Sequence, residues 1–242
     1  MKKAFLSCAL LLAAATAAPA AGLNLAWNNC AGDAGVQNIA FACDTNTGNR
    51  SLVCSIVLGR DIPDLVQGEL VVDLVSASAT LPDWWGFLTA GSCRQVSLFL
   101  FEHEGTNCPG FFAPAAATVV GAYQPGKHGL PNEARLLSIH GVLAADAVTR
   151  FAGQEYGIAR WTIMNTKTVG TPSCTGCQTP VCLVFNSARF TTPADTPVGT
   201  LLTGAANPGS DYVTWQGGAG TNCPAATPTK NATWGSVKSL YR

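Results

Sequence analysis

The sequence predicts an all-β protein, a disulfide-stapled β-sandwich with a short helix at its C-terminal end. Three observations carry this prediction. Apolar and polar residues alternate in many short segments, 25 glycines and 14 prolines punctuate the chain, and ten cysteines are present. Alternation is the pattern of half-buried strands, and short strands separated by turn residues are typical of sandwiches.

The alternating pattern marks ten candidate strands, which occupy Leu23–Trp27, Asn38–Cys43, Ser51–Leu58, Glu69–Ser76, Arg94–Phe101, Thr118–Tyr123, Ala134–Val142, Tyr156–Met164, Val181–Phe190 and Asp211–Gln216. Long apolar stretches such as ELVVDLVS (69–76) and YGIARWTIM (156–164) are typical of strands in a sandwich core. Strands of this number and spacing favour jelly-roll or cohesin-like connections.

Helical patterns are few. IPDLVQG (62–68) and LAADAVTRFAG (143–153) have room for a turn or two. ATWGSVKSLYR (232–242) predicts a short helix capped by Thr233, with Trp234, Val237 and Tyr241 on one face. We expect that face to dock onto the body of the protein.

Residues 1–20 have the layout of a secretory signal peptide. Lys2 and Lys3 precede an apolar run, and Ala18-Pro19-Ala20 supplies a small-residue cleavage site. We expect cleavage after Ala20, a single domain over residues 21–242, and a secreted, periplasmic or cell-surface location. The apolar run is too short to cross a bilayer and no later segment is apolar enough, so no membrane span is expected.

The charge balance argues against nucleic acid as a partner. Removing Lys2 and Lys3 from 14 basic residues leaves 12, against 14 acidic residues. No basic patch is available to neutralise phosphates. Charged residues make up only 12% of the chain and apolar residues 48%, which indicates a folded protein and not a disordered tail.

Nine cysteines remain after the signal peptide, and in an oxidising compartment they predict a disulfide framework. Because nine is odd, one thiol is left over. Cys54 is the expected free thiol, since it shares the apolar face of a strand with Leu52 and Ile56. The expected disulfide cysteines are Cys30, Cys43, Cys93, Cys108, Cys174, Cys177, Cys182 and Cys223.

The stretch SCTGCQTPVC (173–182) places three cysteines in ten residues. A zinc knuckle, a redox C-x-x-C pair and a structural staple are the alternatives. The knuckle pattern breaks, because its third ligand position holds Cys182 where a histidine is expected and its fourth holds Ser187. A redox pair needs a helix start that this Gly/Pro/Thr-rich loop lacks. A staple is favoured, because closing a long loop covalently stabilises it.

A short repeated motif leaves open an alternative interpretation of the domain organisation. GTNCP occurs at residues 105–109 and again at 220–224. Two divergent half-repeats are therefore the alternative to one domain, although no linker separates two bodies.

Catalytic motifs are scarce, so the sequence leans toward a protein that is not an enzyme. It holds no G-x-S-x-G, H-E-x-x-H, phosphate-binding or dinucleotide-binding motif. The most reactive-looking cluster is Glu102-His103-Glu104, in which Glu102 and His103 are the candidate catalytic residues. The alternative is that these three residues are simply solvated charges at the end of a strand. A glycosidase carboxylate pair needs two carboxyl groups about 5–10 Å apart across a cleft, and the sequence assigns no such pair among Asp61, Asp64, Glu69, Asp73 and Asp83.

DTNTGN (44–49) resembles the start of a calcium loop, with Asp44 and Asn46 as candidate metal ligands. The later ligand positions do not match, and an Asx/Gly-rich turn explains the same residues. We expect no metal site and no cofactor.

Adjacent indoles in LPDWWGF (81–87) are the best candidate for ligand binding. In an extended chain Trp84 and Trp85 point to opposite sides, and an outward indole would offer a platform for a sugar ring. The alternative, that both indoles plug the end of the sandwich, is the commoner arrangement for tryptophan in a loop flanked by Pro82 and Phe87.

The loop C-x-G-C-x-x-P-V-C (174–182) and the ending W-G-x-V-K-S-L-Y-R (234–242) resemble those of a group of uncharacterised secreted bacterial proteins. The resemblance covers nearly the whole mature chain. It implies export and a common fold, and it brings no activity or site residue.

The sequence thus predicts a secreted or cell-surface protein with a non-catalytic binding or structural role. A secreted carbohydrate-binding or carbohydrate-active protein that uses an exposed Trp84 or Trp85, with Glu102 or His103 nearby, is the alternative. The expected partners are a glycan, another extracellular protein or a second copy of the chain.

Overall fold

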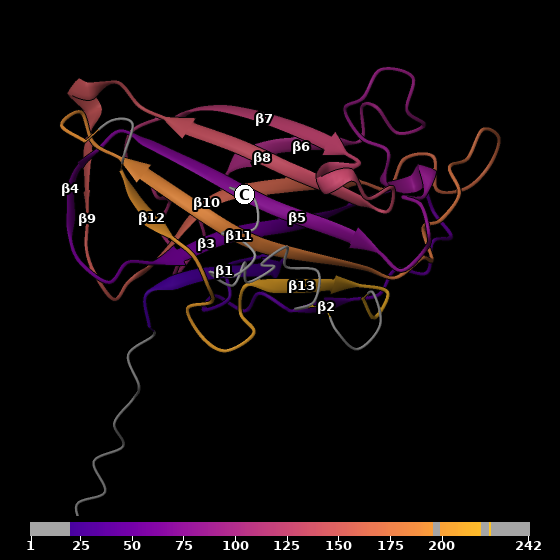
Figure 1. The fold of residues 1–242 in the computed structure, drawn as a ribbon, viewed down its shortest axis with the longest axis horizontal. Helices are drawn as coiled ribbons and strands as arrows, with labels where there is room; N and C mark the ends of the chain where they lie inside the picture. The colour runs from indigo at the N-terminus through magenta and orange to yellow at the C-terminus, as the bar shows by residue number, and fades with distance from the viewer. Residues whose placement is uncertain (1–19, 196–198, 219–222, 224–242) are drawn as a thin grey trace, which may run out of the picture.

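The computed structural model describes residues 20–195, 199–218 and 223 (Figure 1). The expected signal peptide, up to residue 19, and the expected C-terminal helix lie outside the described residues. Within the described part of the chain, no helix has the length and apolar character needed to cross a membrane.

The smaller layer of the molecule is a four-stranded antiparallel sheet. Its strands, in spatial order, are β1 (Gly22–Trp27), β3 (Asn49–Val57), β10 (Glu155–Met164) and β6 (Leu98–Glu102). β1 is buried along its whole length: β3 pairs with it, and its residues Leu23, Leu25 and Trp27 also donate backbone hydrogen bonds to Gly204, Ser210 and Val36.

The larger layer is a seven-stranded sheet. In spatial order its strands are β2 (Asn38–Ile39), β13 (Tyr212–Trp215), β11 (Val181–Thr191), β5 (Gln67–Ser76), β8 (Glu133–Gly141) and β7 (Thr118–Pro125), and β12 (Thr200–Leu202) also pairs with β11. Figure 1 shows this layer face on, with β5 and β11 at its centre. Its ladders are antiparallel except between β13 and β2.

A two-stranded ribbon and three short 3-10 turns complete the described structure. The ribbon joins β4 (Ile62–Leu65) to β9 (Val148–Arg150), and the turns are η1 (Asp83–Trp85), η2 (Lys127–Gly129) and η3 (Ala144–Asp146). No α-helix is present among the described residues.

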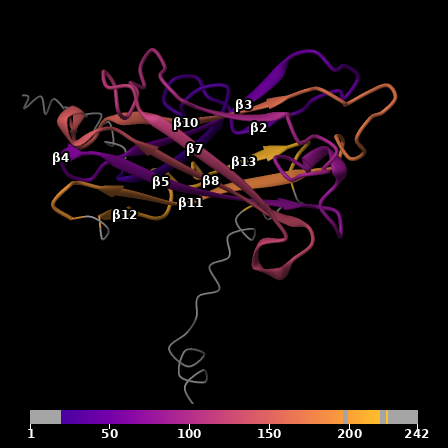
Figure 2. The same ribbon diagram turned by 90° about the horizontal axis from the view of Figure 1, so that it is seen from above.

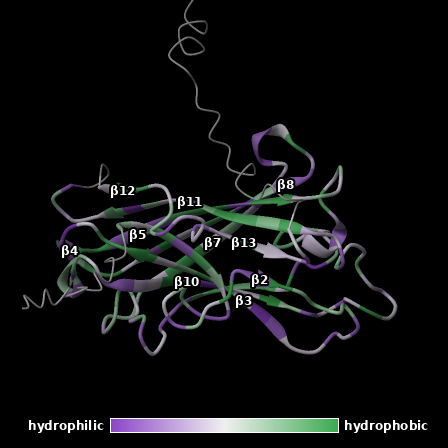
Figure 3. Cartoon of the chain, turned by 90° about the horizontal axis from the view of Figure 1, so that it is seen from below, coloured by the Kyte–Doolittle hydropathy of each residue, from purple (hydrophilic) through white to green (hydrophobic). Residues whose placement is uncertain are grey.

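The two sheets pack face to face around one apolar core (Figure 2). The chain passes repeatedly between the layers. It runs from β3 in the smaller sheet to β5 in the larger one, returns to β6, crosses to β7 and β8, returns to β10, and crosses again to β11. On β5, alternate residues Leu70, Val72 and Leu74 enter this core. The residues between them face outward, as period-two geometry requires. Figure 3 shows apolar residues along the strands of both layers.

The predicted fold class is confirmed: the protein is an all-β sandwich of two main sheets with four disulfides. Each of the ten predicted strands overlaps an observed one. The helical interpretation of IPDLVQG was wrong, because Ile62–Leu65 pairs with Val148–Arg150 as a ribbon. LAADAVTRFAG holds one 3-10 turn, at Ala144–Asp146, and then the partner strand of that ribbon.

The four disulfides join segments that are distant in sequence, 41 to 134 residues apart. The bonds are Cys30–Cys108, Cys43–Cys177, Cys93–Cys174 and Cys182–Cys223. The C-x-x-C loop therefore contains two half-cystines with different partners. It is a staple that ties the loop before β11 to two other loops.

Candidate functional site

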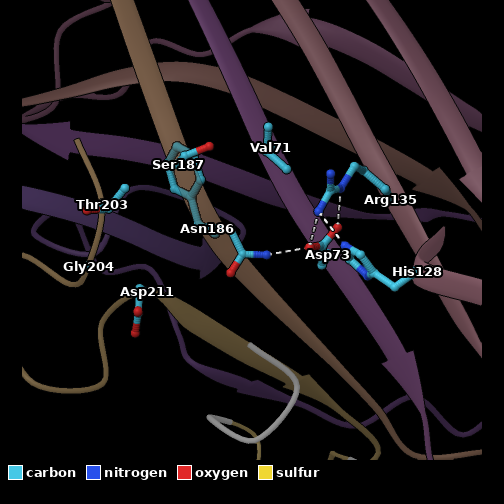
Figure 4. Close-up of a pocket in the computed structure, with 10 residues that line it drawn as sticks. Val71, Asp73, His128, Arg135, Asn186, Ser187, Thr203, Gly204 and Asp211 are labelled. Atoms are coloured by element: carbon cyan, nitrogen blue, oxygen red, sulfur yellow. Dashed lines mark hydrogen bonds and ion pairs between the residues drawn. The ribbon is translucent and has the colours of Figure 1, made fainter. Parts of the chain in front are cut away.

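The main candidate site is a pocket of about 680 Å³ on the outer face of the seven-stranded sheet (Figure 4). Side chains from β5, β8 and β11 form its floor. The segment between β12 and β13 forms the opposite wall with Thr203, Gly204 and Asp211. The pocket thus lies on the side of the sheet that faces away from the core.

An ion pair occupies the floor of the pocket. Asp73 on β5 stands directly opposite Arg135 on β8 in the strand register. Arg135 donates two hydrogen bonds, from Nε to Oδ1 at 2.6 Å and from Nη2 to Oδ2 at 2.7 Å. The side chains are only 7% and 19% exposed, so the pair is fixed and largely desolvated. These bonds also raise the pKa of Arg135.

A β-bulge adds an amide to this pair. The register between β11 and β5 shifts between Phe185 and Ser187, which leaves Asn186 as the extra residue. Its Nδ2 donates to Oδ2 of Asp73 at 2.5 Å. A bulge of this kind re-aims one side chain, and here it turns an amide toward the ion pair.

His128, from the 3-10 turn η2, lies at the end of the ion pair. Arg135 Nη2 and His128 Nε2 are 3.1 Å apart, and His128 Nδ1 is 3.1 Å from Glu133 Oε2. Since a guanidinium only donates, Nε2 is the acceptor and Nδ1 carries the proton that is donated to Glu133. The imidazole is therefore part of a hydrogen-bond chain that holds Arg135 in place.

Asp211 lies on the opposite side of the pocket from this hydrogen-bond chain, as Figure 4 shows. Burial raises the pKa of its carboxyl group above the ordinary value. A partly desolvated carboxylate at a pocket wall is stabilised by a cationic group brought in by a ligand.

The pocket residues do not form an acid–base–nucleophile set. His128 is bonded to Arg135 and Glu133 and not to the hydroxyl of Ser187. Asp73 is bonded on both oxygens. The arrangement suits binding by fixed polar groups.

Two further rows of the outer face lie next to the pocket. Each row consists of one residue from each of β11, β5, β8 and β7, paired across the strands. The first row is Ser187, Val71, Leu137 and Ala122, and the second is Arg189, Glu69, Ile139 and Val120. Five of these residues form what we call the apolar strip, namely Val71, Leu137, Ala122, Ile139 and Val120. Val120 is 61% exposed and Ile139 is 43% exposed. Grouped apolar side chains on an exposed sheet face are typical of interaction surfaces.

The tryptophan pair does not form the candidate outward platform. Trp84 and Trp85 are both 0% exposed. Their centroids lie 4.9 Å and 5.6 Å from that of Trp215, respectively. The pair sits in the 3-10 turn η1, where three residues make a turn, so neighbouring side chains do not point to opposite sides. The extended geometry assumed from the sequence is wrong here.

A buried arginine fixes Trp84 from the other side. The guanidinium of Arg94 lies 3.6 Å from the centre of the Trp84 ring and donates to the carbonyl oxygens of Trp84 and Thr166. Burial lowers the pKa of Arg94. The carbonyl bonds and the ring replace the lost hydration, so the cation is structural.

Glu102 and His103 line a second, smaller pocket of about 420 Å³ at the end of β6. Burial raises the pKa of Glu102, whose Oε2 accepts the backbone N–H of Ala117 at 3.2 Å. His103 is 5% exposed, and burial lowers its pKa. Its Nε2 lies 2.8 Å from Asn29 Oδ1. Both side chains are engaged in packing the β6 end.

Asp44 and Asn46 lie in a turn that contacts the loop after β10. Oδ1 of Asn46 accepts the backbone N–H groups of Thr168 and Val169, at 2.7 Å and 3.0 Å. These donors occupy both acceptor positions of the amide oxygen, so none is left for a metal ion. Across residues 20–195, 199–218 and 223, no group of three acidic, histidine or cysteine side chains is placed to hold a metal.

Cys54 is the free cysteine among the described residues, and it is buried in the core of β3. Burial in apolar surroundings raises its pKa, which keeps the thiol protonated and unreactive. It acts as a small core residue.

Comparisons with known proteins leave the chain without an assigned family. Neither a protein-family model nor a curated protein sequence matches it. Among solved structures, the cohesin module of a family 33 glycoside hydrolase from Clostridium perfringens matches with a TM-score of 0.34 at 8% identity, over 81% of this chain and 93% of that one. The second type II cohesin module of the scaffoldin ScaA from Acetivibrio cellulolyticus matches with a TM-score of 0.34 at 7% identity, over 77% and 91%. Likenesses at this level carry no argument about the partner of this chain.

Proposed function

We propose that the protein is an exported, non-catalytic binding protein whose ligand site is the pocket and apolar strip on the outer face of the seven-stranded sheet. Export is supported by the pattern of residues 1–20 and by four disulfides, which form and persist in oxidising compartments. Membership of the group of secreted bacterial proteins with the same two motifs belongs to this proposal.

The single observation that carries the proposal is the ordered polar floor beside exposed apolar residues. Asp73, Arg135 and Asn186 are held by hydrogen bonds of 2.5–2.7 Å. Groups fixed in this way lose little entropy when a ligand arrives, which is the advantage of a preorganised site. The neighbouring Val120 and Ile139 supply apolar area, as the centre of a protein interface does.

The favoured ligand is a protein segment that carries basic and apolar side chains. This face carries carboxylates at Glu69, Glu133 and Asp211, which attract basic side chains, and the strip offers apolar area for apolar ones. A sugar ring is less favoured, because both indoles of the candidate platform are buried.

Selection from a displayed library of short random peptides tests this function. The full chain is the bait, and selected peptides are titrated by calorimetry. We expect basic and apolar residues among the selected peptides. Asn186→Ala removes the amide that fixes Asp73 in the pocket floor, and we expect it to weaken peptide binding about tenfold, roughly the effect of one hydrogen bond to a charged group. Gln95→Ala is the matched control, since Gln95 is an exposed amide in a loop outside the site.

The outcomes separate the alternatives. Peptides whose affinity is equal in Asn186→Ala and wild type would remove the pocket from the proposal. Binding of soluble glycans in the same calorimeter, with no peptide selected, would favour the carbohydrate alternative instead.

A further inference from the structure

We propose that the segment bound on this outer face is residues 224–242 of the chain itself, held beside it by the Cys182–Cys223 disulfide. The inference rests on the proposed function, because it names the protein segment that fills the same site. Four observations support it: the position of the tether, the reach of the segment, its charge and its apolar content.

The disulfide places the start of this segment on the outer face. Cys182 and Val184 are the outward residues of β11 at the end nearest the pocket, and Cys182 pairs with Val75 in the register. They form a buried cluster with Cys223, against which Val75 and Tyr212 pack. Cys223 is 4% exposed. The chain therefore leaves residue 223 from a position one row before the Asp73–Arg135 pair.

The distances are short compared with the length of the segment. In the register the apolar strip begins at Val71, four residues along β5 from Val75, which is about 13 Å at the rise of a strand. Crossing from β11 to β7 takes three strand spacings, about 14 Å. Trp234 lies eleven positions after Cys223, and an extended chain of that length reaches about 36 Å. Trp234 can reach every part of the face.

The charges of the segment and the face are complementary. Residues 224–242 contain Lys230, Lys238 and Arg242 and no acidic residue. The outer face carries four carboxylates, at Glu69, Asp73, Glu133 and Asp211, against the guanidinium groups of Arg135 and Arg189. A basic segment is thus attracted to a face with an excess of carboxylates.

The apolar residues of the segment match the strip. Trp234, Val237, Leu240 and Tyr241 lie within eight residues of each other. Burying an indole against exposed aliphatic side chains removes apolar area from water on both partners. The tether raises the effective concentration of the segment to the millimolar range, so it has an advantage over a separate partner of equal affinity.

Carbodiimide cross-linking of the full chain tests the placement. The reagent joins a lysine amine to a carboxylate in direct contact, and the products are mapped by mass spectrometry. Docking predicts that Lys230 and Lys238 are joined to Glu69, Glu133 and Asp211. Cross-links to Asp83 and Glu104, which are exposed but outside this face, measure random encounter.

A double substitution separates docking from tethering. W234S/Y241S keeps the disulfide, both lysines and all carboxylates, and removes two apolar anchors. We expect the yield of face cross-links to fall about tenfold as the docked population is lost. Ile139→Arg, in the exposed strip, is expected to lower the yield too, whereas the control Leu143→Arg is not, since Leu143 is 74% exposed and lies outside the strip.

The results either support the inference or overturn it. Equal yields at face and off-face carboxylates, or a yield unchanged in W234S/Y241S, would overturn it. If library peptides bind in an Asn186-dependent way while the cross-links fail, the proposed function stands and the inference falls. If no peptide binds either the wild type or W234S/Y241S, the proposed function itself falls.

Discussion

His140 shows how a single buried side chain couples folding to pH. It is 0% exposed on β8, its Nε2 lies 3.2 Å from Ser138 Oγ, and burial lowers its pKa from 6.5 to about 4. The folded state keeps the imidazole neutral, while the unfolded chain takes up a proton near pH 6.5. Stability is therefore fully present above pH 6.5 and is lost as the pH falls toward 4.

We expect this one group to lower the free energy of unfolding by about 3 kcal/mol between pH 7 and pH 4. Urea denaturation at several pH values measures the slope. His140→Gln should flatten it in this range, although His103 leaves a residual slope of the same sign because burial lowers its pKa as well. An unchanged slope in His140→Gln would mean that His140 is protonated in the folded state.

The Asp73–Arg135 pair gives a second prediction at the residue scale. Arg135→Ala leaves a carboxylate that is 7% exposed with only Asn186 as a charge-stabilising partner. Removing one member of a buried pair costs about 3 kcal/mol, while replacing both by apolar residues costs much less. Chemical denaturation should therefore find Asp73→Val with Arg135→Leu more stable than Arg135→Ala alone. The reverse order would show that the pair is solvated.

Aromatic contacts hold the 3-10 turn η1 against the core. Trp84 packs on Trp215, Trp85 and Phe87 and receives the guanidinium of Arg94. We expect Trp84→Ala to destabilise the fold by about 3–5 kcal/mol, as large-to-small changes in a core do. Val96→Ala serves as the control, since Val96 is 76% exposed. Thermal unfolding measures the stability of both variants. A decrease in unfolding free energy below about 1 kcal/mol for Trp84→Ala would place the indole outside the core.

The loop before β11 depends on its disulfides because it has no strand of its own. Cys93–Cys174 closes a separation of 81 residues. Replacing both cysteines by serine should lower the free energy of unfolding by about 2–5 kcal/mol and leave the sandwich folded. Non-reducing peptide mapping should still find Cys43–Cys177. Zinc binding by the thiols of the reduced chain, with stability restored, would instead favour a metal knuckle.

At the scale of the whole molecule, period-two patterning predicted most of the strands, because most of them are half-buried. It missed β12 and took Ile62–Leu65 for a helical segment, since strands of three or four residues give too few alternations. The outward candidate for the tryptophan pair assumed an extended chain, whereas the pair lies in a 3-10 turn. The pocket could not be foreseen: Asp73 and Arg135 are 62 residues apart, and only the register places them opposite each other. The bulge at Asn186 leaves no clear mark in the alternation.

Backbone amide chemical shifts of the isotope-labelled full chain, recorded with and without a selected peptide, test most directly whether the outer face is the binding site. The expected result is a set of shifts confined to β5, β8 and β11 around Asp73, Arg135 and Asn186, together with Asp211. Shifts confined to the second pocket, around Glu102 and His103, would contradict this account and place the binding site at the end of β6 instead.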